Sequence, residues 1–124
     1  MRGLRRFEGA LGGRGAAGTA AVRAALNNEV LPRHLGNLDR LAAAAAAAPG
    51  SGGWLAGTAE PTICDFVLAC SLKDLTSGAV DGIEGETLLA PFPALRRFLE
   101  RFVALPAVAQ WRARCAEAGC EAQL

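Results

Sequence analysis

Four cysteines and a single histidine are the residues of this 124-residue chain best suited to bind a metal or to react. Five residues separate Cys64 from Cys70 and four separate Cys115 from Cys120, which is not the C-x-x-C spacing of a zinc site. The histidine, His34, has no identifiable acidic partner, so we expect a structural or solvated side chain. We interpret the cysteines as buried or idle thiols in a reducing compartment, with a disulfide or a metal site as alternatives. Cys64 and Cys70 lie on the expected central helix, where we expect them to be packing residues.

Other catalytic arrangements find little support. No serine lies in a G-x-S-x-G segment or beside an identifiable base, and the chain contains no tyrosine. Asp81, Glu84 and Glu86 lie close in sequence but lack EF-hand spacing, so we expect solvated loop carboxylates. The sequence therefore predicts no catalytic residue and no metal site, and the chain alone is expected to be inactive.

Charge and length exclude several classes of partner. The formal net charge is +1, which gives no strong field toward nucleic acid or an anionic membrane. No apolar run reaches the ~18–20 residues of a membrane span, and the alanine run at 42–48 is too short. A chain of this length forms one domain and can bury about two-thirds of its unfolded surface.

The stretch from residue 54 to residue 70 reads as a loop that turns sharply into a helix. Thr62 stands at the expected N-cap and Asp65 follows three residues later, which predicts a structural capping box between the two. The run that follows is apolar nearly all round, which is typical of a helix inside a domain. We therefore expect a buried central helix at about 63–76.

Further helices are indicated on both sides of this segment. Thr19 is expected to cap a short helix that ends near residues 27–28, and Pro32 to open a second one. Pro93 and Pro106 each suit the first turn of a later helix. The side chains expected to face inward are Leu31, Leu35, Leu38, Leu41, Ala45, Leu95, Phe98, Leu99, Phe102, Val108 and Trp111. Those expected to face water are Arg96, Arg97, Glu100 and Arg101. Four to five helices without period-2 alternation predict an all-α helical bundle.

The two ends of the chain are expected to lie outside the bundle. Residues 1–18 are rich in arginine, glycine and alanine, and their glycines work against a long helix. We interpret 1–18 as a low-complexity or disordered leader, with an organelle transit peptide as the alternative. The helical domain then spans 19–118, and 119–124 form a frayed tail.

Residues 55–57 (Leu-Ala-Gly) are followed, after a short spacer, by 62–66 (Thr-Ile-Cys-Asp-Phe), which gives the pattern Leu-x-Gly, spacer, Ser/Thr-x-x-Asp. This pattern resembles the signature that opens the central helix in the C-terminal, all-helical domain of glutathione S-transferases. Cys64 stands where the family usually has alanine. The match covers about 29–112. Residues 77–83 are similar to the end of the central helix in sigma-like members of the family. Residues 92–95, 104–108 and Trp111 are similar to the family's last two helices.

The resemblance implies one half of a two-domain enzyme that conjugates glutathione to electrophiles. In that family a thioredoxin-like N-terminal domain binds and activates glutathione, and we expect that domain to lie outside this sequence. Glutathione is then a co-substrate of the whole enzyme, and no cofactor is expected on this chain. The helical half contributes homodimer contacts and a hydrophobic substrate-pocket wall, for which Val22, Leu26 and Trp111 are the candidates.

The resemblance also leaves alternatives open. The family has a long helix near the N-terminus that lines the cleft and meets the dimer mate, and residues 1–18 depart from that pattern. Similar domains serve as non-catalytic assembly modules in translation factors and tRNA synthetase complexes, and an inactive truncated paralogue is a further reading. The expected compartment is the cytoplasm, or an organelle if the leader is a transit peptide.

Overall fold

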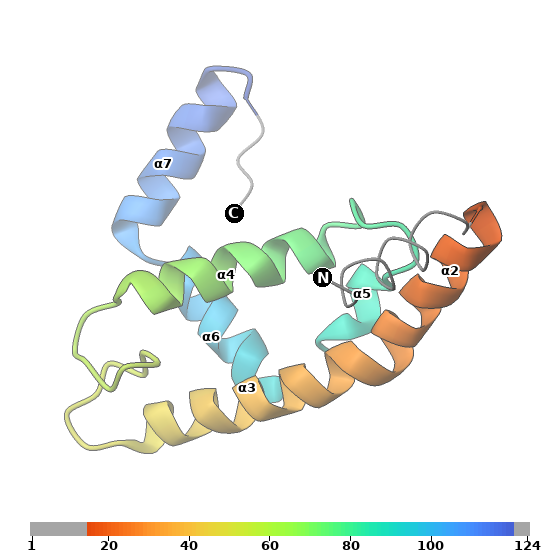
Figure 1. The fold of residues 1–124 in the computed structure, drawn as a ribbon. Helices are drawn as coiled ribbons and strands as arrows, with labels where there is room; N and C mark the ends of the chain where they lie inside the picture. Colours follow the sequence, from red (N-terminus) through yellow and green to blue (C-terminus); the bar gives the residue numbers. More distant parts are fainter. Residues whose placement is uncertain (1–14, 121–124) are drawn as a thin grey trace, which may run out of the picture.

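The computed structural model describes residues 15–120, which fold into an all-α bundle (Figure 1). No strand occurs in that range, so the predicted fold class is confirmed. One long helical run comes first, made of α2 (Ala16–Ala25), a π-helical segment η1 (Leu26–Val30) and α3 (Leu31–Ala47). It is followed by α4 (Ile63–Thr76), the single turn α5 (Gly85–Leu88), α6 (Pro93–Val103) and α7 (Pro106–Glu117).

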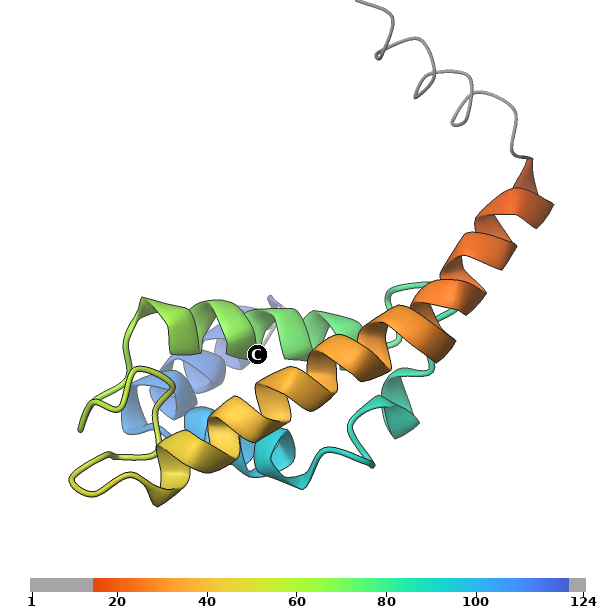
Figure 2. The ribbon, with the colours of Figure 1, turned by 60° about the horizontal axis from the view of Figure 1, so that its bottom comes forward.

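The core lies between α3, α4 and α6. α3 packs along α6, α4 contacts α5 and α6, and α7 contacts α6 before it projects away from the bundle (Figures 1 and 2). Phe98 and Phe102 of α6 meet the ring of Trp54 edge to face, with ring centroids 6.1 and 6.4 Å apart. The aromatic ring of Trp54 thus pins the loop after α3 onto α6.

The start of α4 is built around the carboxylate of Asp65. Thr62 is the N-cap, and the reciprocal capping box with Asp65 is present. The Asp65 carboxylate accepts the N–H of Thr62 at 2.8 Å and the N–H of Leu55 at 2.9 Å, and its side chain is 0% exposed. The bond to Leu55 ties the preceding loop to the helix, a contact that the spacing of the sequence does not reveal.

Pro32 lies in the first turn of α3 as predicted, but the predicted cap at Thr19 and the break between the first two helices are wrong. The chain runs without a break from α2 to α3, and Thr19 lies inside α2, whose N-cap is Gly15. Pro32 lacks an N–H and crowds the turn before it, which usually ends a helix. The wider π turn of η1, in which the N–H of Leu31 donates to the carbonyl of Leu26, accommodates the proline and lets the helix continue.

The prediction that α4 is buried all round is also wrong. Its inner face carries Asp65, Ala69 and Leu72, whereas Ile63 is 81% exposed and Val67 is 60% exposed. Cys64 and Cys70 are exposed as well, so they are not packing residues. The reason is that α5 and α6 cover one side of α4, and no element within residues 15–120 covers the other.

Two apolar side chains expected to face inward are exposed. Leu41 is 60% exposed. An α-helix has 3.6 residues per turn, so the buried side of α3 passes through Leu35, Ala42 and Ala45, and Leu41 lies beside it. Trp111 is 43% exposed.

Arg101 does not point freely to water. Its Nη1 donates to the carbonyl of Gly53 at 2.9 Å, and its guanidinium lies 5.8 Å from the centroid of the Trp54 ring. Because it bonds a backbone carbonyl of the loop before α4, Arg101 works together with Trp54 to fix that loop on α6. The expectation that it faces water is therefore wrong.

A carboxylate of α3 supports the beginning of α6. Pro93 opens α6 as expected, and the carboxylate of Asp39 on α3 accepts the N–H of Leu95 in its first turn at 2.9 Å.

Residues 1–14 and 121–124 lie outside the described residues, so the predicted leader and most of the predicted tail stay predictions. Helix α2 begins within the predicted leader, at Ala16.

Candidate functional site

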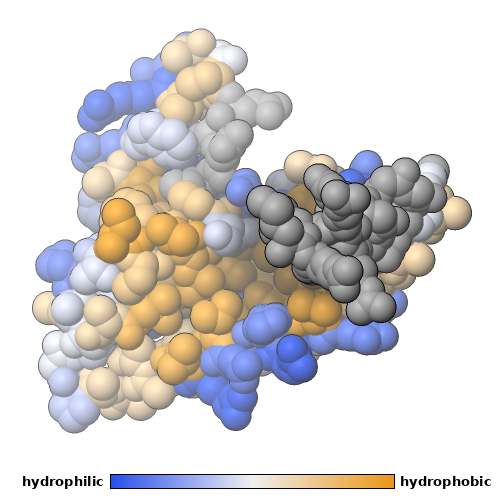
Figure 3. Space-filling view, viewed as in Figure 1, coloured by the Kyte–Doolittle hydropathy of each residue, from blue (hydrophilic) through white to orange (hydrophobic). Residues whose placement is uncertain are grey.

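An exposed apolar stripe runs along the first turns of α4. Ile63, Phe66, Val67 and Cys70 recur at steps of three and four residues, so they share one side of the helix, and we name them the α4 face. All of them are exposed. Apolar surface gathers in the middle of the space-filling view, where α4 crosses the molecule (Figure 3). Contiguous apolar surface of this kind is typical of an interaction or ligand site.

A cavity of about 470 Å³ adjoins the α4 face where α6 passes into α7, and we name it the α7 cavity. Its size falls in the ~300–1,000 Å³ range of small-molecule sites. The ring of Phe66 forms one wall and packs edge to face on Phe102, with centroids 4.9 Å apart. The lining residues are Glu60, Pro61, Phe66, Leu105, Pro106, Ala107, Val108 and Trp111.

The lining of the α7 cavity suits an apolar guest. Glu60 supplies the one charged side chain among its lining residues, and Phe66 and Trp111 supply aromatic rings. These rings can stack on a flat, uncharged molecule and exclude water from it. None of the lining residues is a cysteine, histidine, serine or lysine, so apart from the Glu60 carboxylate they offer no nucleophile and no base.

The predicted substrate-binding residues lie at two ends of the molecule. Trp111 lines the α7 cavity, as just described. Val22 is exposed on α2 and Leu26 packs against the core at the start of η1, and neither lines that cavity. Figures 1 and 2 both place α2 and α7 at opposite ends of α4. The structure therefore does not bring Val22 and Leu26 together with Trp111. It adds Phe66, Val108 and Pro61, which the sequence analysis did not propose as ligand contacts.

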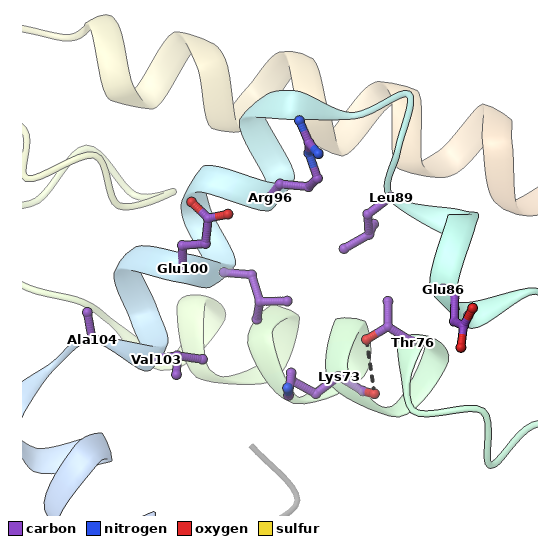
Figure 4. A pocket seen from close by; sticks show the side chains of 10 residues that line it. Lys73, Thr76, Glu86, Leu89, Arg96, Glu100, Val103 and Ala104 are labelled. Atoms are coloured by element: carbon purple, nitrogen blue, oxygen red, sulfur yellow. Dashed lines mark hydrogen bonds between the residues drawn. The ribbon is translucent and has the colours of Figure 1, made fainter.

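A second cavity, of about 570 Å³, lies between α4, α5 and α6 (Figure 4). Leu89 and Leu99 contribute apolar surface, and charged side chains come from all of these helices. The charged lining residues are Lys73, Glu86, Arg96 and Glu100. Because two cations and two anions cancel, this cavity has no net charge with which to select an ionic ligand.

His34 and the loop carboxylates do not assemble into a site in the described part of the chain. Within residues 15–120, no group of three or more His, Cys, Asp and Glu side chains could hold a metal ion. Asp81 pairs with Arg23 at 3.3 Å, Glu84 and Glu86 are exposed, and His34 is exposed on α3. None of the helices in the described part of the chain combines the length and apolarity that a bilayer crossing requires.

The fold and the site define an all-helical domain that offers an apolar face and an apolar cavity. The family model described as "Glutathione S-transferase, C-terminal domain" matches residues 14–114, and the chain belongs to that family. The family resemblance seen in the sequence is thereby confirmed. No curated protein and no solved structure matches the chain.

Proposed function

We propose that this chain is the helical half of a glutathione transferase, of the sigma-like type, which conjugates glutathione to electrophiles. The observation that carries the proposal is the α7 cavity, an apolar and aromatic pocket within a domain of that family. In this proposal the α7 cavity forms part of the wall that holds the apolar electrophile. A thioredoxin-like domain binds glutathione and activates its thiol, since the lining residues of the α7 cavity include no tyrosine, serine or cysteine for that step.

The α4 face is the proposed contact surface of this half. Full burial of a Val or Ile side chain contributes about 1.5–3 kcal/mol. Ile63 and Val67 are 81% and 60% exposed and forgo most of it, so covering them favours association. We propose that the thioredoxin-like domain and a second copy of the chain supply that cover. The proposed compartment is the cytoplasm, because the free state of Cys64, Cys70, Cys115 and Cys120 suits a reducing environment.

A binding experiment tests the pocket wall. The neutral fluorescent probe N-phenyl-1-naphthylamine is titrated into the full chain and its affinity is measured from probe emission. The Trp111→Ala variant is expected to bind about tenfold more weakly, because it loses an aromatic wall worth ~1–1.5 kcal/mol.

Two control variants locate the probe. Val103→Ser changes the cavity between α4, α5 and α6, and Val22→Ala changes the exposed surface of α2. Both are expected to bind the probe as the parent chain does. Unchanged affinity in Trp111→Ala, or a loss confined to Val22→Ala, would contradict the α7 cavity as the apolar site.

The division of labour between the halves has its own test. The chain alone is expected neither to stay on immobilised glutathione nor to conjugate glutathione to 1-chloro-2,4-dinitrobenzene. Adding a thioredoxin-like domain of a sigma-type enzyme in trans is expected to restore measurable turnover. Retention or turnover by the chain alone would refute the absence of a thiol-activating group.

A second candidate function is a non-catalytic assembly module of the same fold, and an inactive truncated paralogue is the third. The exposed α4 face favours the assembly role, since it is a ready protein-binding surface without need of the cavity. Restored turnover in the experiment above distinguishes the enzyme from both alternatives.

A further inference from the structure

The C-terminal end of α7 brings two cysteines together. Gly119 takes the left-handed conformation with φ 69°, and its N–H donates to the carbonyl of Ala116 at 3.2 Å. The N–H of Cys120 donates to the carbonyl of Cys115 at 2.9 Å. These two bonds define a Schellman motif, in which the side chains at the positions of Cys115 and Cys120 are commonly in contact.

The thiols themselves confirm this proximity. The Cys120 Sγ donates to the Cys115 carbonyl at 3.2 Å. A side-chain hydrogen bond with the neighbouring Cys120, which favours the protonated form, raises the pKa of the Cys115 thiol, and burial raises it further. Cys115 is half-buried and Cys120 is exposed. Cys120 is therefore the thiol that a solvent-borne reagent reaches first, with Cys115 directly behind it.

We propose that Cys115 and Cys120 form a dithiol site that a low-molecular-weight disulfide oxidises to an intramolecular disulfide. The Cys120 thiolate attacks one sulfur of the small disulfide, forms a mixed disulfide and releases one small thiolate. The Cys115 thiolate then attacks the Cys120 sulfur, forms the Cys115–Cys120 bond and releases the second small thiolate. The two protons lost by the protein thiols go to the released thiolates. The pair is thus oxidised by two electrons and the small disulfide is reduced to two thiols.

The geometry meets what a disulfide requires. A direct backbone hydrogen bond between the two residues keeps their Cα atoms near the range of about 4.4–6.8 Å that disulfides span. The Cys115–Cys120 disulfide would link the last turn of α7 to the residue that follows it, one helical turn beyond Trp111. Closing it needs no rearrangement of the core, because Cys115 and Cys120 lie where α7 projects from the bundle (Figure 1).

Cys64 and Cys70 provide a matched control in the same chain. Both are exposed, and they are six residues apart on α4. At about 100° per residue their side chains leave the helix roughly 120° apart, so a disulfide between them requires α4 to unwind. These thiols are expected to take up small-molecule adducts instead of pairing with each other.

The experiment is equilibration of the full chain in oxidised and reduced glutathione, acid quenching, alkylation of free thiols and tryptic mass mapping. Trypsin cuts after Lys73 and Arg114, so one peptide, 41–73, holds Cys64 and Cys70 and another, 115–124, holds Cys115 and Cys120. The 115–124 peptide is expected to be about 2 Da lighter than its reduced form, with the equilibrium constant for its closure at least tenfold that of 41–73.

Two further arms decide whether the fold is responsible. Concentrated urea is expected to lower the closure constant of the 115–124 peptide severalfold. Gly119→Val, which disfavours the left-handed position, is expected to lower it in the folded chain while leaving the value in urea unchanged. Glutathione adducts on both Cys115 and Cys120 without closure, equal closure in the two peptides, or a constant indifferent to urea and to Gly119→Val would overturn the proposal.

Discussion

Single side chains connect the helices of this domain through backbone groups. Asp65 accepts N–H groups from its own helix start and from Leu55, and Asp39 accepts the N–H of Leu95 on another helix. The sequence spacing was enough to predict the bond within the capping box, because its partners are three residues apart. It could not predict the bonds to Leu55 and Leu95, because those depend on how separate segments pack.

Asp65→Ala is expected to lower the free energy of unfolding by about 2–4 kcal/mol. The change removes the capping box and leaves two N–H groups without their acceptor in a partly buried setting. Asp74→Ala, on the exposed side of the same helix, is the control and should stay within about 0.5 kcal/mol. Urea denaturation measures both, and equal stabilities of the two variants would contradict the role given to Asp65.

Gly53→Ala is expected to be clearly more destabilising than Gly57→Ala. Both glycines have positive φ, of 83° and 72°, so each substitution introduces similar backbone strain of ~1 kcal/mol. Only at Gly53 would the added Cβ collide with the guanidinium of Arg101, which is bonded to the Gly53 carbonyl and placed over Trp54. We expect about 1–2 kcal/mol of extra loss, measured by thermal unfolding. Equal losses of stability in the two variants would mean that displacing Arg101 from Gly53 and Trp54 does not destabilise the domain.

At the scale of elements, the sequence predicted the later helices better than the first ones. Pro93 and Pro106 stand at the N1 or N2 position of their helices, and Gly78 and Gly119 follow the ends of α4 and α7 with positive φ. Such signals are local, so they survive in the fold. Pro32 also stands at the N1 or N2 position, of α3, but the chain before it stays helical, because the π turn of η1 takes up the strain that would otherwise end the helix.

One side chain of the π-helical segment η1 connects it to α5. The Asn27 side-chain oxygen accepts the N–H of Glu84 at 3.1 Å, which joins η1 to the start of α5. Asn27→Ala is expected to destabilise the domain by about 1 kcal/mol and to speed amide hydrogen exchange across residues 84–88. Glu29→Ala, two residues on and exposed in the same segment, should leave that exchange unchanged. Equal exchange rates in the two variants would contradict this connection.

At the scale of the whole molecule, the apolar sequence of α4 predicted burial that residues 15–120 supply on one side only. The periodicity of a helix reports which side chains avoid water, and does not report whether the same chain or another covers them. Ile63 and Val67 are the residues where this difference appears. The candidate site shared this limit, because Trp111 was identified by resemblance, whereas Phe66 became visible only because the fold makes it line one cavity with residues of α7.

Association through the α4 face is testable with one charge. If a second copy covers the face, sedimentation equilibrium of the parent chain is expected to show a concentration-dependent dimer. Val67→Lys is expected to shift it to monomer by burying an unpaired charge. Ser71→Lys, exposed on the same helix, should dimerise as the parent does, and at concentrations where the parent is monomeric neither change should move the melting temperature by more than about 2 °C. A parent chain that is monomeric at every concentration would contradict the homodimer.

The carboxylate of Asp39 has a consequence for the order in which the domain folds. It meets the N–H of Leu95 across 56 residues of chain, so this support for the start of α6 exists only after α3 and α6 have docked. The bond between Asp65 and Thr62 spans three residues and can form while the chain is still open. We therefore expect refolding kinetics in which changes at Asp65 slow the folding rate, whereas changes at Asp39 chiefly accelerate unfolding.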